Sequence, residues 1–266
     1  AYEPGGRVLL QFTNQITANL YALQWINNDI LAFGNGDFSV RFLDWKNSVV
    51  VRQCSAVHNA TIRHMDLMPA STSYTDLLIT SSDDALIKVW NMNTCTVNVT
   101  LSGHTAGVYY FKVLTADTRL FASASADTTV RIWNWLSGTL LANLVGHTGL
   151  VTSLEVLSSG QLLASGSYDT SIKIWSLTTY TCIRNISGHT SNVLSLVAAS
   201  SNDSYLLSGG QDFTLRKWYV PTGIQVLSSI TGSPSTVLTS LDGSVATSQL
   251  DGYIYMWDVN TLTHSR

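Results

Sequence analysis

Hydrophobic and polar residues alternate along the chain in short runs of strand length. One stretch shows the pattern clearly, with alternating or β-branched apolar residues at 151–157, 162–165, 171–175 and 181–186, and Gly, Ser, Asp or Thr between them. Runs of this length and composition predict strands separated by turns. No segment sustains the 3.6-residue apolar period of an amphipathic helix. The pattern therefore predicts an all-β protein.

The four-strand pattern is one copy of a repeat. An Asp is followed by a Trp six residues later in five places, and successive Trp residues lie 39 to 43 residues apart. These pairs are Asp84 with Trp90, Asp127 with Trp133, Asp169 with Trp175, Asp212 with Trp218 and Asp251 with Trp257. An earlier copy runs from Asp37 to Leu43, with Leu in place of Trp. Self-similarity at this period is typical of a repeat architecture built from one supersecondary unit.

A His marks the start of four copies. It lies 22 to 26 residues before the Asp, as His58, His104, His147 and His189, and in the last three copies a Gly precedes it. A Gly-His dipeptide, a turn Asp and a strand Trp at this period resemble the WD-repeat (WD-40) family. The resemblance runs from about residue 7 to residue 263.

The resemblance implies a single β-propeller domain spanning residues 1–266, with six blades of four antiparallel strands. Its repeats would end near Leu43, Trp90, Trp133, Trp175, Trp218 and Trp257. Seven blades, one of them missing or supplied by another domain, is the alternative. The phase of the repeat predicts closure, because residues 7–12 form an outer strand while the last full strand, 253–257, is a third strand. Pairing the N-terminal strand with the last blade would remove exposed sheet edges.

The resemblance also implies a buried polar tetrad in each blade, made of the His, a Ser or Thr, the turn Asp and the Trp. Such groups must bond to one another, since burying them unpaired is costly. Four complete sets are present: His58 with Thr80, Asp84 and Trp90; His104 with Ser123, Asp127 and Trp133; His147 with Ser165, Asp169 and Trp175; and His189 with Ser208, Asp212 and Trp218. The sixth copy has Ser233 where His belongs, and the first has Phe33 and Leu43 at the hydroxyl and Trp positions.

Sets of Ser, His and Asp raise the alternative of a hydrolase. A catalytic triad should occur once, with an accessible nucleophile, whereas these sets recur about four times at a fixed period. Phosphate-binding glycine loops, a His-Glu-x-x-His helix and a Gly-x-Ser-x-Gly elbow do not occur in the sequence. We therefore expect a protein that is not an enzyme and has no metal, no cofactor and no catalytic residues.

The amino-acid composition argues against nucleic acids and membranes as partners. Only 12% of the residues are charged, the formal net charge is −3, and no run of Lys or Arg occurs, so a nucleic-acid partner is not expected. No apolar run is long enough to span a membrane. Cys54, Cys95 and Cys182 lack paired spacing and are expected to be small apolar side chains. The compartment stays open, with a cytoplasmic location slightly favoured over secretion.

Function is expected where the copies differ. Propellers of this family usually bind partners on the narrow top face, so the resemblance places a protein or peptide site there. The residues predicted to contact the partner are Tyr21, Arg63, Asp83, Tyr109, Tyr168, Gln211, Asn192 and Leu194. Tyrosines offer large contact area with little entropy loss. We therefore expect a protein-interaction scaffold that is one domain of a longer chain. The alternative is a glycan- or small-ligand-binding propeller, which would be compatible with secretion.

Overall fold

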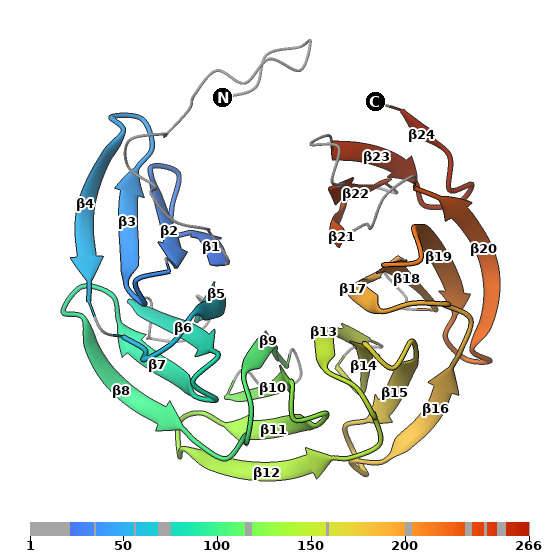
Figure 1. The fold of residues 1–266 in the computed structure, drawn as a ribbon, viewed down its shortest axis with the longest axis horizontal. Coiled ribbons are helices and arrows are strands. Elements are labelled where there is room, and N and C mark those ends of the chain that lie inside the picture. The colour runs from blue at the N-terminus through green and yellow to red at the C-terminus, as the bar shows by residue number, and fades with distance from the viewer. Residues whose placement is uncertain are drawn as a thin grey trace. The chain divides into compact units, whose positions relative to one another are not determined.

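The computed structural model describes residues 22–34, 36–55, 57–68, 76–114, 119–157, 160–199, 204–231, 236–241, 244–248 and 254–265. Within these ranges the protein consists of strands joined by turns and has no helix (Figure 1). The strands form sheets of four antiparallel strands. The predicted all-β class and the four-strand unit are therefore confirmed. The chain divides into two compact units, residues 1–100 and 101–266, which are described separately.

The first unit contains two sheets, and in each the strands are neighbours in chain order. The strands of the first sheet are β1 (Ala22–Trp25), β2 (Ile30–Gly34), β3 (Val40–Asp44) and β4 (Val49–Cys54). Those of the second are β5 (Ile62–Leu67), β6 (Leu77–Ser82), β7 (Ile87–Asn91) and β8 (Thr96–Leu101), whose last residue falls at the unit boundary.

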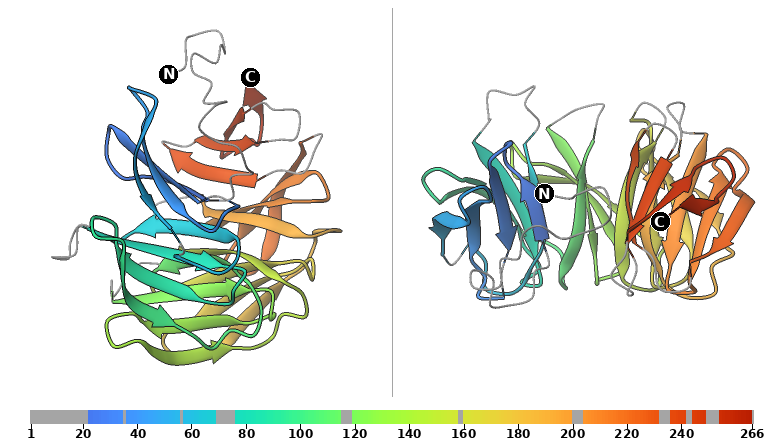
Figure 2. Two further views of the ribbon diagram at one scale, coloured as in Figure 1. Left: turned by 60° about the vertical axis from the view of Figure 1, so that its left-hand side comes forward. Right: turned by 90° about the horizontal axis from the view of Figure 1, so that it is seen from above.

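The second unit contains four sheets of the same design. The first two are β9 (Val108–Val113), β10 (Leu120–Ser125), β11 (Val130–Asn134), β12 (Thr139–Leu144), and β13 (Val151–Leu157), β14 (Leu162–Ser167), β15 (Ile172–Ser176), β16 (Cys182–Ile186). The last two are β17 (Val193–Ala198), β18 (Tyr205–Gly210), β19 (Thr214–Tyr219), β20 (Ile224–Ile230), and β21 (Thr236–Leu241), β22 (Ser244–Ser248), β23 (Ile254–Asp258), β24 (His264–Ser265). Two further views show the strands of each sheet lying side by side (Figure 2).

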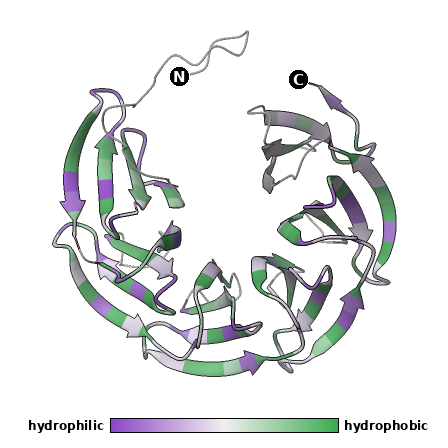
Figure 3. Ribbon diagram, viewed as in Figure 1, coloured by the Kyte–Doolittle hydropathy of each residue, from purple (hydrophilic) through white to green (hydrophobic). Residues whose placement is uncertain are grey.

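The hydrophobic core lies between successive sheets of a unit. In the second unit, Ile172 and Ile174 of one sheet pack in the same cluster as Val193, Leu206 and Trp218 of the next. Hydrophobic and hydrophilic segments accordingly alternate along the strands (Figure 3). Each sheet therefore needs its neighbour to bury its apolar face, which is the reason a single repeat cannot fold alone. Among the described residues, no helix that could span a membrane is present.

The first sheet of the first unit replaces the polar tetrad with apolar packing. Phe33 and Leu43, at the hydroxyl and Trp positions, are 0% and 1% exposed. Its turn carboxylate, Asp37, bonds instead to Ser39 and Arg41, and the Asp37 side chain is 44% exposed. Large apolar side chains can substitute for a hydrogen-bonded set because no buried polar atom is then left without a partner.

One prediction for the last sheet is wrong. The edge of β23 that was expected to receive residues 7–12 is paired with β24, through Trp257 with His264 and Met256 with Ser265. Asp258 causes this return, because its carboxylate accepts the backbone N–H groups of Asn260 at 2.8 Å and Thr261 at 2.9 Å. A two-residue strand was too short to be recognised from the sequence pattern. Residues 7–12 lie outside the described ranges.

The prediction that all three cysteines are unpaired is also wrong. Cys54 at the end of β4 forms a disulfide with Cys95 in the β7–β8 turn, 41 residues later. Cys182 is free and exposed. The sequence rule failed because it looked for closely spaced cysteines. In a repeat protein, residues about one period apart can be spatial neighbours, since they belong to adjacent units.

Candidate functional site

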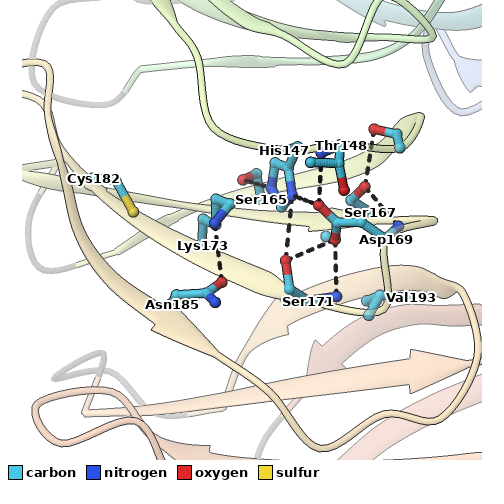
Figure 4. A network of polar contacts seen from close by, with 12 residues as sticks. His147, Thr148, Ser165, Ser167, Asp169, Ser171, Lys173, Cys182, Asn185 and Val193 are labelled. Carbon is cyan, nitrogen blue, oxygen red and sulfur yellow. Dashed lines mark hydrogen bonds and ion pairs between the residues drawn. The ribbon is translucent and has the colours of Figure 1, made fainter.

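The turn Asp organises one end of each repeat, and Asp169 shows how (Figure 4). It lies between β14 and β15, and its carboxylate accepts the backbone N–H groups of Thr148 at 3.0 Å and Ser171 at 2.9 Å. The Ser171 hydroxyl donates to the same carboxylate at 2.7 Å. An Asp that accepts bonds from residues two positions ahead stabilises a tight turn. Here it also holds the loop that carries His147.

A chain of hydrogen bonds runs inward from this carboxylate. His147 Nδ1 lies 2.7 Å from Asp169 Oδ2, and His147 Nε2 lies 2.8 Å from Ser165 Oγ. Trp175 Nε1 donates to Ser165 Oγ at 2.8 Å. The carboxylate can only accept, so Nδ1 carries the proton and Nε2 accepts from the Ser165 hydroxyl. A neutral imidazole therefore satisfies every buried donor in the set.

The first complete set has the same chain with a Thr in place of the Ser. Thr80 is 0% exposed, and its Oγ1 lies 2.8 Å from His58 Nε2 and accepts the Trp90 indole N–H at 3.1 Å. His58 Nδ1 lies 2.9 Å from Asp84 Oδ2. Thr80 therefore occupies the position that the resemblance implied for the hydroxyl. Its bond from the indole is the longest of the four complete sets, whose other three measure 2.7 to 2.8 Å.

The remaining two complete sets repeat this geometry. In each, the His Nδ1 lies 2.7 to 2.9 Å from the nearer Asp oxygen, and the His Nε2 lies 2.6 to 2.7 Å from the Ser hydroxyl. The members are His104, Ser123, Asp127 and Trp133 in one set, and His189, Ser208, Asp212 and Trp218 in the other. In the last sheet Trp257 donates to Thr247 at 2.8 Å, while Ser233 and Asp251 lie outside the described residues.

The electrostatics keep three of these histidines neutral. Burial lowers the pKa of His104, His147 and His189, and although the facing carboxylates raise it, the net shift is downward from 6.5. Burial alone would raise the pKa of Asp169, but hydrogen bonds from Ser171, Thr148 and His147 lower it to about 2. At neutral pH each of these sets thus pairs an ionised Asp with an uncharged imidazole.

The tetrad hydroxyls are in no position to act as nucleophiles. Thr80, Ser123, Ser165 and Ser208 are each 0% exposed, so a substrate carbonyl could not reach them. Each of these hydroxyls donates its proton to a His and accepts the indole N–H of a Trp, which leaves the oxygen enclosed. Nucleophilic catalysis requires an accessible hydroxyl beside its base. Among the described residues, no group of three potential metal ligands occurs.

Several of the predicted partner-contacting residues occupy β-bulges. The strand pairing shifts by one residue at Arg63 in β5, Tyr109 in β9, Thr152 in β13 and Leu194 in β17. A bulged residue has no partner across the ladder, so its side chain can be re-aimed away from the regular alternation. In these four inner strands the bulge lies at the end nearest the turn Asp. Each of these four copies can therefore present a different side chain there.

In the first unit the predicted cation and anion bond to each other. Arg63 donates from Nε to Asp83 Oδ1 at 2.8 Å and from Nη2 to Asp83 Oδ2 at 2.6 Å. Their side chains are 26% and 27% exposed. A bidentate pair of this kind neutralises both charges and fixes both planes. Arg63 is thus already engaged by a carboxylate. Tyr21, the other residue predicted in this unit, lies outside the described residues.

In the second unit the predicted residues are all uncharged: two amides, two tyrosines and one leucine. Asn192 donates from Nδ2 to Gln211 Oε1 at 2.7 Å, so these two amides are held together. Tyr168 is 43% exposed in the turn before Asp169. Tyr109 and Leu194 are half-buried at their bulges. The structure therefore offers an amide pair and an exposed aromatic ring on neighbouring sheets, with no charged side chain among the predicted residues.

The repeats also match a family model. A model described as "WD domain, G-beta repeat" matches residues 52–91, 95–134, 138–176 and 180–219, together more than half of the chain. The chain belongs to the WD-repeat family. WD-repeat domains commonly act as scaffolds for protein–protein interactions and are generally not enzymes. A search of curated proteins found no match to the chain.

Two exposed residues that follow a turn Asp were missed by the sequence reasoning. Phe213 follows Asp212, has φ of 62° and is 45% exposed, and Phe38 follows Asp37, has φ of 64° and is 36% exposed. A bulky residue at positive φ is an outlier that costs on the order of 1 kcal/mol or more. Comparing the residues after each turn Asp, as well as those before it, would have flagged both Phe38 and Phe213.

Proposed function

We propose that this WD-repeat domain is a non-catalytic scaffold in which the six sheets form one propeller spanning residues 1–266. Its protein or peptide partner would bind at the sheet ends that carry the turn Asp residues. The observation that carries this proposal is the contrast between the two residue sets. The tetrads are buried and bonded to themselves. By contrast, the residue before the turn Asp differs in every copy, and the bulged residue varies among the copies, with Leu repeated at 194 and 238.

The regular packing within each unit supports a single propeller. Consecutive sheets share one hydrophobic cluster after another, and each sheet places its inner strand against the next, as β13 does against β17. Repeats that stack in this way build one continuous core rather than separate domains.

The chemistry of the site favours an uncharged peptide segment. Tyr168 and Phe213 offer exposed rings for an apolar or proline-containing anchor. The Asn192–Gln211 amide pair can exchange hydrogen bonds with a peptide backbone, since amides both donate and accept. Arg63 is paired with Asp83, so an acidic or phosphorylated ligand would first have to displace that carboxylate. We therefore expect an affinity that depends little on salt.

Site-specific photo-cross-linking tests the binding face. A photoreactive amino acid replaces Tyr168 in one variant and Leu136 in a matched control, because Leu136 is 51% exposed but lies in the β11–β12 turn, at the opposite end of its sheet from Asp127. Cross-links from position 168 identify the partner. Equal capture of that partner from position 136 would contradict the assignment.

Point variants then test the contact energetically. Tyr168→Ala and Tyr109→Ala should each weaken the identified partner's affinity at least tenfold, while far-UV circular dichroism and the urea midpoint stay unchanged for Tyr168→Ala, whose ring is exposed. Leu136→Ala serves as the exposed apolar control and should bind normally. Normal affinity of Tyr168→Ala for a cross-linked partner would refute the proposed site. A glycan array on the same proteins tests the alternative ligand class.

A further inference from the structure

We propose that Cys54 and Cys95 are a native modification site: the domain matures in an oxidising compartment, where their disulfide fastens the first sheet to the second. This inference does not depend on the proposed binding function. It also runs against the cytoplasmic location that the sequence slightly favoured. Structural disulfides persist in oxidising environments and are rare where thiols are kept reduced.

The two cysteines are placed for a cross-link. Their Cα atoms are 5.3 Å apart, within the usual range for disulfides. Cys54 is 1% exposed and sits in the core cluster with Val40, Phe42 and Trp90. A few residues away, Arg52 Nη1 donates to the carbonyl of Met92 and to Asn93 Oδ1, each at 2.9 Å. Strand β4 is therefore attached to the β7–β8 turn both by the hydrogen bonds of Arg52 and by the Cys54–Cys95 disulfide.

Cys54 departs from the residue type that other repeats use at the same place. Cys54 pairs across the ladder with Val40, as Leu144 pairs with Val130 and Ile186 with Ile172, so aliphatic residues are the alternative there. The turn position of Cys95 has φ of 58°, and every other repeat also has a residue of positive φ there: Ser48, Gly138, Tyr180, Gly223 and Leu262. A Cys in this left-handed conformation costs free energy that Gly does not.

The second unit shows what occupies this contact when no cysteine is present. A methyl group added to Gly223 would lie 3.2 Å from Ile186 Cγ1, so these two positions face each other directly. In the same place Arg184 Nη1 donates to the carbonyl of Thr222 at 3.1 Å, as Arg52 does to the β7–β8 turn. The Cys54–Cys95 pair thus lies where Ile186 faces Gly223 and where Leu144 and Tyr180 share one cluster. A Cys in place of the aliphatic residue, set against a turn position that also holds Cys, indicates a selected cross-link.

The disulfide involves the sheet of the first unit that lacks the hydrogen-bonded tetrad. The first sheet has Phe33 and Leu43 instead of a hydroxyl and a Trp, and its Asp37 bonds only to residues of its own turn and strand in the bonds described. The second sheet has a complete tetrad, which buries Trp90. A covalent tie to that better-anchored sheet limits local opening of the first one, because it restricts the chain when the sheet separates.

The chemistry requires an electron acceptor. Each thiol loses one hydrogen, and the two sulfurs form one bond. The two electrons and two protons pass to the disulfide of a thiol–disulfide oxidoreductase, which becomes a dithiol, by exchange through a mixed disulfide. Cys182 has no cysteine partner among the described residues and would stay a thiol or form a mixed disulfide with a small thiol.

Trapping thiols in the source cells tests the compartment. Cells are quenched in acid, and the denatured protein is alkylated with N-ethylmaleimide before digestion and mass spectrometry. The proposal predicts a linked pair of peptides containing Cys54 and Cys95, with neither residue alkylated until reductant is added. Alkylation of both residues before reduction would overturn it. Cys182 is the internal comparison, because it is exposed and unpaired.

Matched variants test the fastening role. Cys182→Ser keeps the disulfide, and the pair Cys54→Ile with Cys95→Gly copies the contact of Ile186 and Gly223 without a cross-link. Reductant should speed hydrogen exchange of β3 and β4 amides in Cys182→Ser by roughly a hundredfold, and should leave the sheet β13–β16 unchanged. The double variant should exchange rapidly with or without reductant. Equal hydrogen-exchange rates of the β3 and β4 amides in Cys182→Ser with and without reductant would refute the proposal that the disulfide stabilises the first sheet.

Discussion

Removing one tetrad hydroxyl should destabilise the domain far more than its size suggests. Ser165→Ala deletes a single oxygen from a residue that is 0% exposed. That oxygen accepts the Trp175 indole N–H at 2.8 Å and lies 2.8 Å from His147 Nε2. The substitution leaves two buried polar groups without partners, and each costs about 1–3 kcal/mol. We expect a loss of about 2–6 kcal/mol in the free energy of unfolding.

Ser171→Ala is the matched control. Its hydroxyl donates to Asp169 Oδ1 at 2.7 Å, but that carboxylate keeps its bonds from Thr148 and His147. This Ser is only half-buried, so we expect a loss of about 0.5–1.5 kcal/mol. Both variants are measured by urea unfolding, and the comparison uses midpoints at unchanged m-value. Equal losses in the two variants would refute the view that the inner hydrogen bonds stabilise the repeat.

Three further predictions concern pH, the ion pair and the last sheet. The folded-state pKa of His104, His147 and His189 lies below 6.5, so the unfolded chain binds more protons than the folded protein below that pH. The urea midpoint should therefore fall as the pH drops below 6.5 and stay level above it. A midpoint that rises on acidification would contradict this prediction. Asp169, with a folded pKa of about 2 against the ordinary 3.8, should add a further loss as pH falls from 3.8 toward 2. Asp83→Ala should cost no more than about 1 kcal/mol of stability, because the ion pair is partly exposed. It should also let Arg63 bind acidic peptides in a salt-dependent way, and adding Arg63→Ala to the same chain should abolish that binding. Fluorescence anisotropy of a labelled acidic peptide at low and high salt measures this binding. Thr247→Val should cost about 1–3 kcal/mol in thermal or urea unfolding, less than Ser165→Ala, because it orphans only the Trp257 N–H, and a larger loss would imply a second partner of Thr247.

The repeat made most of the fold predictable. Asp and Trp six residues apart, with a His before them, placed the turn and the third strand of each sheet, and β7, β11, β15 and β19 all end within a residue of the repeat's Trp. The interactions behind this are local in the repeat and recur identically, even where Thr80 replaces the Ser of the other complete sets. A pattern seen five times in one sequence carries far more information than a single motif.

The sequence failed at a disulfide that joins two repeats and at an ion pair within one repeat. Cys54 and Cys95 are 41 residues apart, so no short spacing revealed them, although Cys54 replaces the aliphatic residue found at its position in other repeats. The pairing of Arg63 with Asp83 was also missed, because a bulge in β5 aims one side chain at a turn 20 residues away. Comparing repeats position by position would have flagged Cys54, whereas the ion pair could be found only in the structure.

The last sheet shows a different limit. The pattern ended at a third strand, and the prediction filled the open edge with the N-terminal strand. Trp257 instead pairs with His264, whose ring lies 4.5 Å from the indole. A turn closed by one carboxylate, Asp258, was enough to bring two residues back onto the edge. Hydrophobic periodicity cannot detect so short a strand, because two residues show no alternation.

The central claim is that the tetrads support the fold while the variable turn residues recognise the partner. The most direct test measures unfolding free energy and affinity for the cross-linked partner on the same two proteins, Ser165→Ala and Tyr168→Ala, at a temperature where both are folded. The account predicts that Ser165→Ala loses stability and keeps its affinity, while Tyr168→Ala keeps its stability and loses its affinity. Loss of both properties together in either variant, or the opposite assignment, would contradict it.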